Sequence, residues 1–446
     1  MCSLVLTHRP PGRAGEDEMD TGTSTPAPGG GHEPLRVVFY SHDSQGLGHF
    51  RRNRALAHTL AQRLPVLTGR PVTGLLLNGV AGAAARSLPR GFDVVTLPAI
   101  GKTASHQGYG PRHLQLGMDA VLSVRGEIVR ATGLAFRPDL VVVDRHALGV
   151  GGELLAGLHA MRRELPQTRF VLGLRDVLDA PEAVESEWRI TPAELVAELY
   201  DEVWIYGDPA VHDLRTSGEV PDELAPLIRY QGFLAHGRAE EPTDLDPERP
   251  YVVTTAGGGS DGTRLCLAAA RAEVPRGHQH VLITGPQMSD ADHRAVEREA
   301  GPRTSVTRSV DDAAGLIRRS AASVSMAGYN TVAETLATDV PALLVPRERP
   351  RTEQLIRARG LERVGASDLL REQDLTPQAI SRWWASAVRR TVDRRALDLG
   401  GLRAVAGSAA RLVRTSPVLA DRTGLADGAG RTEGVSGREK VLSHVG

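Results

Sequence analysis

Lysine and cysteine are almost missing from this sequence of 446 residues. Lys102 and Lys440 are the only lysines among 53 basic residues, a bias that we interpret as arginine-rich coding without functional meaning. Cys2 and Cys266 are the only cysteines, so one chain can form neither a disulfide framework nor a cysteine-based zinc site. The sequence therefore excludes two common ways of stabilising a small domain.

The sequence also lacks a strong net charge and a long apolar run. Its 53 basic and 54 acidic residues leave a formal charge of -1, so no overall field favours nucleic acid or an anionic membrane. No apolar run reaches the length of a transmembrane helix. The N-terminus carries Pro, Gly, Asp and Glu where a signal peptide needs an apolar core. We expect a cytoplasmic protein without a nucleic-acid partner.

Short apolar runs alternate with helical patterns through most of the chain, whose length allows two or three domains. The first series has predicted strands at residues 36–40, 72–77, 92–97, 139–144, 169–174 and 202–206. The second series has predicted strands at residues 251–255, 280–284, 304–307, 322–326 and 340–345. Such alternation with nearly continuous apolar strands indicates parallel sheets that helices cover on both faces.

We therefore predict an α/β protein with two Rossmann-like, doubly wound domains facing a central cleft. The predicted division is a disordered tail at residues 1–34, a first domain at 35–235, a linker at 236–249, a second domain at 250–414 and a disordered tail at 415–446. The linker is rich in Gly, Pro, Asp and Glu. We expect the last helices to cross back to the first domain.

A glycine loop, GGGSDG at residues 257–262, follows the first strand of the second domain. It matches the dinucleotide pattern G-x-G-x-x-G, but the next strand ends at Thr284 without the carboxylate that a nicotinamide ribose needs. It also matches the nucleophile elbow G-x-S-x-G around Ser260, but no oxyanion-hole segment precedes it. No Walker lysine follows. The favoured interpretation is a loop whose backbone N–H groups bind phosphate, with a serine hydrolase as an alternative.

The segment from 322 to 345 predicts a strand, a glycine turn at Gly328, a helix and another strand. Asn330 and Thr331 resemble a helix start, and Thr331-x-x-Glu334 has the form of a capping box. A helix N-terminus that follows a glycine turn offers free N–H groups and partial positive charge to a diphosphate. The structural alternative is that Thr331 and Glu334 only cap the helix.

His49 closes a second glycine loop, SHDSQGLGH, between the first strand and its helix. Loops at the carboxyl edge of a parallel sheet face the crevice where such folds bind ligands. A neutral imidazole there can accept a proton from a hydroxyl group. Asp144 ends its strand at the same edge and Asp43 lies in the loop, so either carboxylate could orient the ring or act as the base. Asp144 could instead cap a turn.

Asp290 and Asp292 form a carboxylate pair that could bind a metal. Because both lie where a helix should begin, N-capping is the favoured role. The sequence contains no HExxH motif and no His/Cys cluster, so we predict no metal site and no cofactor.

These motifs together resemble the GT-B glycosyltransferases of the MurG-like type and their uncharacterised relatives, over residues 35–390 approximately. The first loop resembles the relatives' G-x-G-H-x-x-R motif at Gly46, Gly48, His49 and Arg52. The second half carries the glycine–serine loop, the x-AG-x-x-T-x-x-E motif at Ala327, Gly328, Thr331 and Glu334, a P-A-x-x-V-P segment at 341–346, and a glutamine-bearing helix start.

The resemblance implies that the second domain binds a nucleotide sugar. Gly328 and Thr331 would lie beside the diphosphate, Glu334 would bind the ribose, and two further residues would occupy the positions of the sugar-binding glutamine pair. The implied donor-binding set is Gly257, Gly258, Gly259, Ser260, Gly328, Tyr329, Asn330, Thr331, Glu334, Glu353 and Gln354. This chain departs from the family at Glu353, at Arg357 in place of an asparagine, and in a first loop that lacks the extra glycine of the MurG type.

We therefore expect a metal-independent, inverting transfer of a sugar from a nucleoside diphosphate, with UDP favoured, to a hydroxyl acceptor. His49 is the first choice for the base and Asp144 the second. The loop at residues 99–112 and the helix after it should shape the acceptor site. A lipid acceptor would add peripheral contact with the cytoplasmic face of a membrane. A nucleotide-sugar epimerase or hydrolase and a non-catalytic sensor are the alternatives on the same fold.

Overall fold

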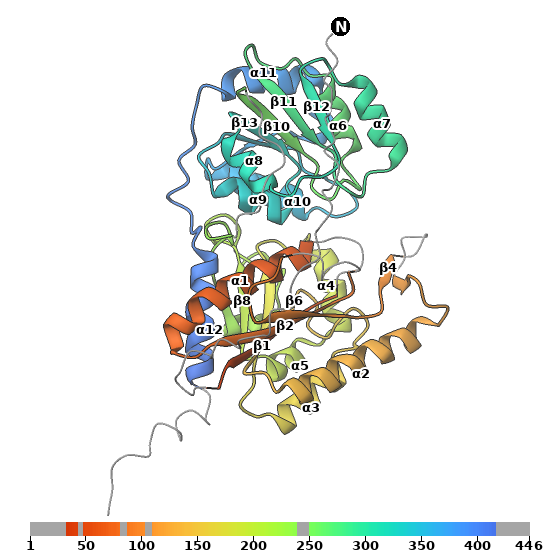
Figure 1. Cartoon of the computed structure of the whole chain (residues 1–446), viewed down its shortest axis with the longest axis vertical. Coiled ribbons are helices and arrows are strands. Elements are labelled where there is room, and N and C mark those ends of the chain that lie inside the picture. Colours follow the sequence, from red (N-terminus) through yellow and green to blue (C-terminus); the bar gives the residue numbers. More distant parts are fainter. Residues whose placement is uncertain (1–32, 43–47, 81–86, 103–108, 239–248, 416–446) are drawn as a thin grey trace, which may run out of the picture.

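The computed structural model describes residues 33–42, 48–80, 87–102, 109–238 and 249–415. Figure 1 shows two α/β units, one above the other. Some predictions fall outside the described residues, so the structure says nothing of them. They concern Asp43, Gly46 and nearly all of the two segments that we predicted to be disordered tails.

The first unit is built on a seven-stranded parallel sheet in the order β3-β2-β1-β6-β7-β8-β9. The strand order reverses between β1 and β6, and the crevice at the carboxyl ends beside such a reversal is where open α/β sheets bind ligands. Ser41, at the end of β1, is in register with Asp144, at the end of β6. The strands are β1 (Leu35–Ser41), β2 (Val72–Asn78), β3 (Phe92–Thr96), β6 (Leu140–Asp144), β7 (Arg169–Arg175), β8 (Glu202–Tyr206) and β9 (Ile228–Tyr230).

Helices cover both faces of this sheet, because its central strands are apolar on both sides. One core joins the sheet to α1, and a second core joins its other face to helices that include α3 and α5. The polar loop predicted at 99–112 contains an antiparallel hairpin, β4 (Ile100–Lys102) with β5 (Tyr109–Pro111). The helices are α1 (Gly48–Thr68), α2 (Met118–Phe136), α3 (Leu155–Glu164), α4 (Pro181–Ile190), α5 (Ala193–Leu199) and the 3-10 helix η2 (Asp222–Leu227).

The second unit repeats the plan with a six-stranded parallel sheet in the order β12-β11-β10-β13-β14-β15. Its order reverses between β10 and β13. The strands are β10 (Tyr251–Thr255), β11 (Gln279–Ile283), β12 (Thr304–Thr307), β13 (Ala322–Ser325), β14 (Ala342–Leu344) and β15 (Asp368–Leu369). The helices are α6 (Thr263–Ala270), α7 (Asp290–Glu299), α8 (Ala313–Arg319), α9 (Tyr329–Leu336), α10 (Glu353–Arg363), η3 (Glu372–Asp374) and α11 (Pro377–Ala387).

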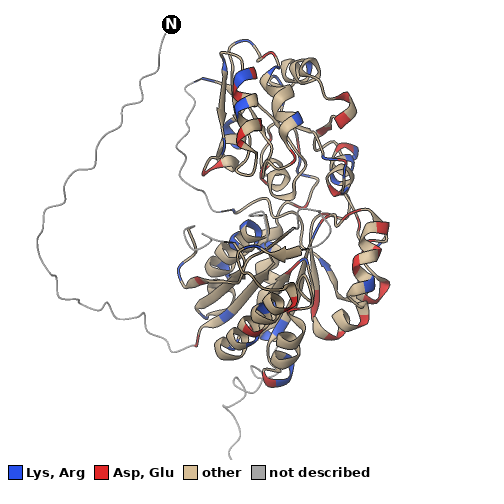
Figure 2. Ribbon diagram, turned by 90° about the vertical axis from the view of Figure 1, so that its right-hand side faces the viewer, with Lys and Arg blue, Asp and Glu red and all other residues tan. Residues whose placement is uncertain are grey.

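The two parallel sheets confirm the predicted doubly wound α/β fold. The edge strands β9 and β15 escaped prediction, since three and two residues are too few to show a pattern. Basic residues (blue) and acidic residues (red) are interspersed on the ribbons of both units (Figure 2). This mixture agrees with a formal net charge near zero.

The last helix, α12 (Gly401–Arg414), belongs by sequence to the second series but packs against α1 of the first unit. In Figure 1 the chain descends from α11, in the upper unit, to α12, beside α1 in the lower unit. Leu402, Val405 and Ala409 are fully or nearly fully buried in the core that they share with α1. The last helix thus crosses back, as we expected.

Two capping predictions are wrong. Helix α9 begins at Tyr329 with Gly328 at its N-cap, so Thr331 lies inside the first turn and no capping box forms. Helix α7 is capped by Ser289, whose hydroxyl accepts from the Asp292 N–H, while Asp290 pairs with Arg308. In both places a residue before the predicted cap already satisfies the geometry of the helix start.

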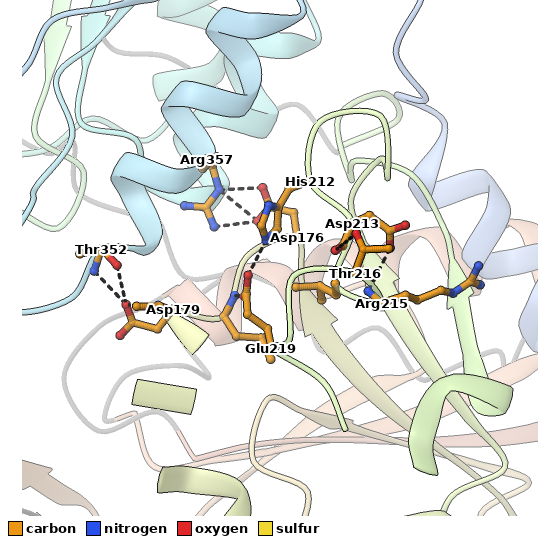
Figure 3. A network of polar contacts seen from close by, with 12 residues as sticks. Asp176, Asp179, His212, Asp213, Arg215, Thr216, Glu219, Thr352 and Arg357 are labelled. Carbon is orange, nitrogen blue, oxygen red and sulfur yellow. Dashed lines mark hydrogen bonds and ion pairs between the residues drawn. The ribbon is translucent and has the colours of Figure 1, made fainter. Parts of the chain in front are cut away.

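A buried ion pair joins the two units. Arg357 of α10 makes a bidentate contact with Asp176, the residue after β7, with the Nη2–Oδ1 distance at 2.7 Å and the Nε–Oδ2 distance at 2.8 Å. Both side chains are at most 1% exposed. Asp179, three residues further, accepts hydrogen bonds from the backbone N–H and the hydroxyl of Thr352, just before α10 (Figure 3). The departure at position 357 therefore serves to hold the units together.

We predict that Arg357→Met lowers the free energy of unfolding by about 3–5 kcal/mol, because it leaves the Asp176 carboxylate buried without its counterion. Urea unfolding followed by circular dichroism measures the change. The matched control is Arg395→Met, since Arg395 is 91% exposed in its pair with Asp393 and should be nearly neutral. Adding Asp176→Leu to Arg357→Met should recover part of the loss. Equal stabilities of the two single variants would contradict this account.

Candidate active site

The carboxyl ends of both sheets open onto one cavity of about 360 Å³. Its walls include residues that follow β1 and β7 of the first unit and β10, β11 and β13 of the second. Among them are Gly48, His49, Arg52, Arg175, Gly257, Gly258, Gly328, Asn330, Thr331 and Glu334. A smaller cavity of about 180 Å³ adjoins the glycine loop and is also lined by Gln354. The structure thus brings most described residues of the predicted site together.

His49, Asp144 and Arg52 form one cluster at the switch point of the first sheet, with Asp144 and Arg52 buried and His49 half-buried. His49 Nδ1 lies 3.1 Å from Asp144 Oδ1. Arg52 donates to both carboxylate oxygens, from Nη2 at 2.6 Å and from Nε at 2.8 Å. Burial raises the pKa of Asp144, but the charge of Arg52 and the contact with His49 outweigh burial and hold the pKa well below its usual range. Asp144 is therefore ionised, which suits it to orient the imidazole.

The proton on the His49 ring can occupy either nitrogen, and the cluster distinguishes the two cases. Arg52 Nη2 lies 2.9 Å from His49 Nδ1, while the Asp144 oxygen lies near the same nitrogen. When Nδ1 carries the proton, it donates to Asp144 and Nε2 is left as an acceptor. When Nδ1 lacks the proton, it accepts from Arg52 and Nε2 is the donor. Only the first tautomer can take a proton from a substrate hydroxyl through Nε2.

Two further histidines surround His49, and sequence reasoning missed both. The His42 ring lies 4.6 Å from the His49 ring and 4.5 Å from the His146 ring, edge to face in each case. Burial, followed by neighbouring positive groups, lowers the pKa of His42 and of His146 well below the usual value. Both rings are therefore neutral near pH 7. The sequence did contain a signal for both histidines. His42 lies in the same loop as His49, and His146 lies two residues after Asp144, so both follow strands that end at this edge of the sheet.

The glycine loop of the second unit requires its glycines. Gly257 and Gly259 have φ values of 63° and 93°, in the left-handed region that side chains disfavour. A Cβ at Gly259 would lie 2.5 Å from the Thr284 carbonyl oxygen, so the loop can approach the next strand only with glycine there. In this conformation the loop contributes Gly257 and Gly258 to the walls of both cavities.

Ser260 lies in this loop with an exposed side chain. Among the residues that the structure describes, no histidine is hydrogen-bonded to its hydroxyl. His278 contacts a backbone carbonyl, His280 contacts Thr254 and Thr304, and His293 contacts Thr284. The histidines that could have activated Ser260 thus have other partners. The serine hydrolase alternative loses its support.

Glu334 does not cap its helix but forms an ion-pair cluster between the units. Its Oε1 lies 2.5 Å from Arg51 Nη2 and 3.4 Å from Arg238 Nη1, and its side chain is 3% exposed. Asn330 is part of the same contact, because its amide donates to the Gly48 carbonyl at 2.9 Å. Sequence reasoning missed Arg51 and Arg238. A diol that binds Glu334 would have to share or displace one of these arginines.

Glu353 and Gln354 begin α10, beside Arg347, which sequence reasoning also missed. Arg347 Nη2 lies 2.6 Å from Glu353 Oε1, and the Arg347 N–H donates to Gln354 Oε1 at 3.2 Å. The other end of the same guanidinium contacts Asp261 of the glycine loop at 2.8 Å. The departure at Glu353 is thus matched by a cation that links it to the glycine loop.

Within the described ranges, no group of three or more His, Cys, Asp or Glu side chains is placed to hold a metal ion. In that same part of the chain, every helix is too short or too polar to span a bilayer.

In sequence, this chain is similar to known glycosyltransferases. The glycosyltransferase family 28 C-terminal domain matches residues 253–388. The chain is 27% identical over 265 residues to a UDP-N-acetylglucosamine--N-acetylmuramyl-(pentapeptide) pyrophosphoryl-undecaprenol N-acetylglucosamine transferase of Symbiobacterium thermophilum, covering 57% of this chain and 66% of the relative. The enzyme of the same name from Klebsiella pneumoniae is 27% identical over 272 residues, covering 59% and 67%. The matches thus span about two thirds of these relatives.

Solved structures show the same fold at low sequence identity. A UDP-glucosyltransferase from Polygonum tinctorium superposes with a TM-score of 0.55 at 12% identity, covering 86% of this chain and 99% of that one. The glycotransferase of kitacinnamycin superposes with a TM-score of 0.53 at 16% identity, covering 87% and 99%. These likenesses confirm the predicted arrangement of two Rossmann-like units around a cleft.

Proposed function

Because the chain is a MurG-like glycosyltransferase of the GT-B fold, we propose that it transfers a sugar from a UDP-linked donor to a hydroxyl acceptor, with inversion and without a metal. One observation carries the proposal. His49, which contacts Asp144, lines the same cavity from the first unit as the glycine loop and the start of α9 line from the second. A base and a diphosphate site on facing walls are what a direct displacement requires.

The donor is proposed to lie on the second unit. Backbone N–H groups of the glycine loop, with Gly328 and Thr331 at the start of α9, would bind the diphosphate, since a helix N-terminus favours negative charge. Glu334 would accept from the ribose hydroxyls. Glu353 and Gln354 would contact the sugar from the start of α10. The names of the curated relatives support UDP as the nucleotide.

His49 is proposed as the general base. Its Nε2 accepts the acceptor's hydroxyl proton while the acceptor oxygen attacks the anomeric carbon. The bond from that carbon to the diphosphate oxygen breaks on the opposite side, and its electron pair stays on the leaving phosphate, so a single displacement inverts the configuration. Asp144 holds Nδ1–H and stabilises the imidazolium. Asp144 itself is a weaker candidate, because Arg52 occupies both of its oxygens.

The acceptor is proposed to bind on the first unit, where Tyr109 of β5 lies beside His42 of the histidine cluster and α2 packs against β5. Its class is a hydroxyl compound. The curated relatives are named for an undecaprenol-linked substrate, and a lipid acceptor of this chain would bring it to the cytoplasmic face of a membrane.

Glu334→Gln should weaken UDP binding by roughly 1.5–3 kcal/mol, the range for a hydrogen bond to a charged group. Isothermal titration calorimetry measures the affinity. The control is Glu299→Gln, because Glu299 forms an exposed pair with Arg271, away from the cavity. If the Glu334 variant is folded and binds UDP as the wild type does, Glu334 serves only the ion pair with Arg51.

His49→Ala should lower kcat by about a hundredfold to ten-thousandfold, the usual contribution of a general base. The affinity for UDP should change little, because the donor lies mainly on the other unit. The control is His278→Ala, because the half-buried ring of His278 contacts the Arg276 backbone carbonyl. A variant with normal turnover but no donor binding would make His49 a binding residue, and a variant without cooperative melting would make it a structural one.

Activity should persist in excess EDTA, because helix N-termini and arginines can neutralise the leaving diphosphate in place of a cation. The test is the rate before and after chelation. Complete loss that manganese or magnesium restores would contradict the metal-independent mechanism.

A further inference from the structure

Arg175 differs from the other arginines around the cavity. It is the last residue of β7, two positions after Gly173, which is in register with Asp144 on the neighbouring strand. Its side chain lines the cavity, and its Nε is buried without a hydrogen-bond partner. Across the described ranges of the chain, the structure gives the Arg175 guanidinium no hydrogen bond and no ion pair.

Four neighbouring arginines have carboxylate partners. Arg52 pairs with Asp144, Arg51 and Arg238 pair with Glu334, and Arg357 pairs with Asp176. A half-buried guanidinium without an anion is unfavourable, because burial penalises its charge. Burial, and then the repulsion of Arg357, lowers the pKa of Arg175 to about 10, which leaves it charged at neutral pH. The fold thus keeps an unneutralised cation in the cavity wall.

Arg175 lines the same cavity as residues of both halves of the proposed site. His49 and Arg52, from the cluster of the proposed base, line it from the first unit. Gly257 and Gly328, from the proposed diphosphate site, line it from the second unit. Arg175 therefore borders the space that a donor bound in this cavity would occupy.

We propose that Arg175 binds a phosphate oxygen of the nucleoside diphosphate from the side of the first unit. This inference rests on the proposed function, which supplies the diphosphate. As the bond from the anomeric carbon to the phosphate oxygen breaks, the electron pair stays on that oxygen, and an Arg175 N–H donates to it without transferring the proton. The start of α9 on one side and Arg175 on the other then share the growing charge.

A diphosphate is favoured over an anionic acceptor because the same cavity contains Gly257, Gly258 and Gly328, whose backbone can bind phosphate. The planar fork of arginine also matches phosphate oxygens. Arg175, which has no partner among the described residues, would be a counterion for the diphosphate of UDP. Uridine has no phosphate, so Arg175 would not contribute to its binding.

The test compares wild type, Arg175→Met and Arg175→Lys for the binding of UDP and uridine by calorimetry, with the full chain. Arg175→Met should weaken UDP roughly ten- to a hundredfold, the loss expected for one charge-assisted hydrogen bond, and leave uridine unchanged. Arg175→Lys should recover part of the UDP affinity. The matched control is Arg189→Met on α4, since Arg189 is 73% exposed and should bind both ligands as the wild type does.

The ligand-free melting temperature separates binding from structure. Arg175→Met should melt at or above the wild type, because it removes a half-buried charge that has no partner among the described residues. Equal affinity for UDP in the wild type and in Arg175→Met would overturn the proposal. It would also be overturned if Arg175→Met lost affinity for UDP and for uridine equally and melted at a lower temperature than the wild type. A variant that binds UDP normally but shows a raised KM for the acceptor would also overturn it. A wild type that binds no UDP would instead refute the UDP donor of the proposed function.

Discussion

The buried ion pair between Arg357 and Asp176 is the constraint on which the cleft depends. It joins α10 of the second unit to the end of β7 in the first, with both side chains almost fully excluded from water. Arg357 also donates to the Ala327 carbonyl, just before the turn that starts α9. The Tyr329 ring lies 5.8 Å from the Arg357 guanidinium and 5.5 Å from that of Arg52. One chain of contacts therefore runs from the donor side to the cluster of His49.

The polar groups of the cleft are organised mainly by arginine. Asp144 is neutralised by Arg52, Glu334 by Arg51 and Arg238, and Glu353 by Arg347. Because these three carboxylates have fixed counterions, the cleft can hold many charges without a large net field. A substrate that enters must replace some of these contacts, so the cleft favours ligands that bring hydroxyl and phosphate groups of their own.

Much of the fold could be predicted from the sequence, because strands and helices reveal themselves through local periodicity. The strands predicted at residues 202–206, 251–255 and 304–307 have the same first and last residues as β8, β10 and β12. The proximity of His49 and Asp144 was also predictable, since the carboxyl ends of parallel strands share one edge. Helix starts were less predictable: Gly328 and Ser289 precede the caps that the patterns indicated, because turn geometry, and not residue type alone, sets the first helical residue.

The sequence by itself determined the class of fold, the two glycine loops and the residues at the sheet edges, because these follow from short-range patterns. Only the tertiary structure decided the partners of the charged side chains. Arginine supplies nearly all of the 53 basic residues, so no pattern distinguishes Arg357, which binds Asp176 across 181 positions, from Arg175, which has no partner among the described residues. An ion pair depends on distances between atoms that are remote in the chain, and those distances exist only once both sheets are packed.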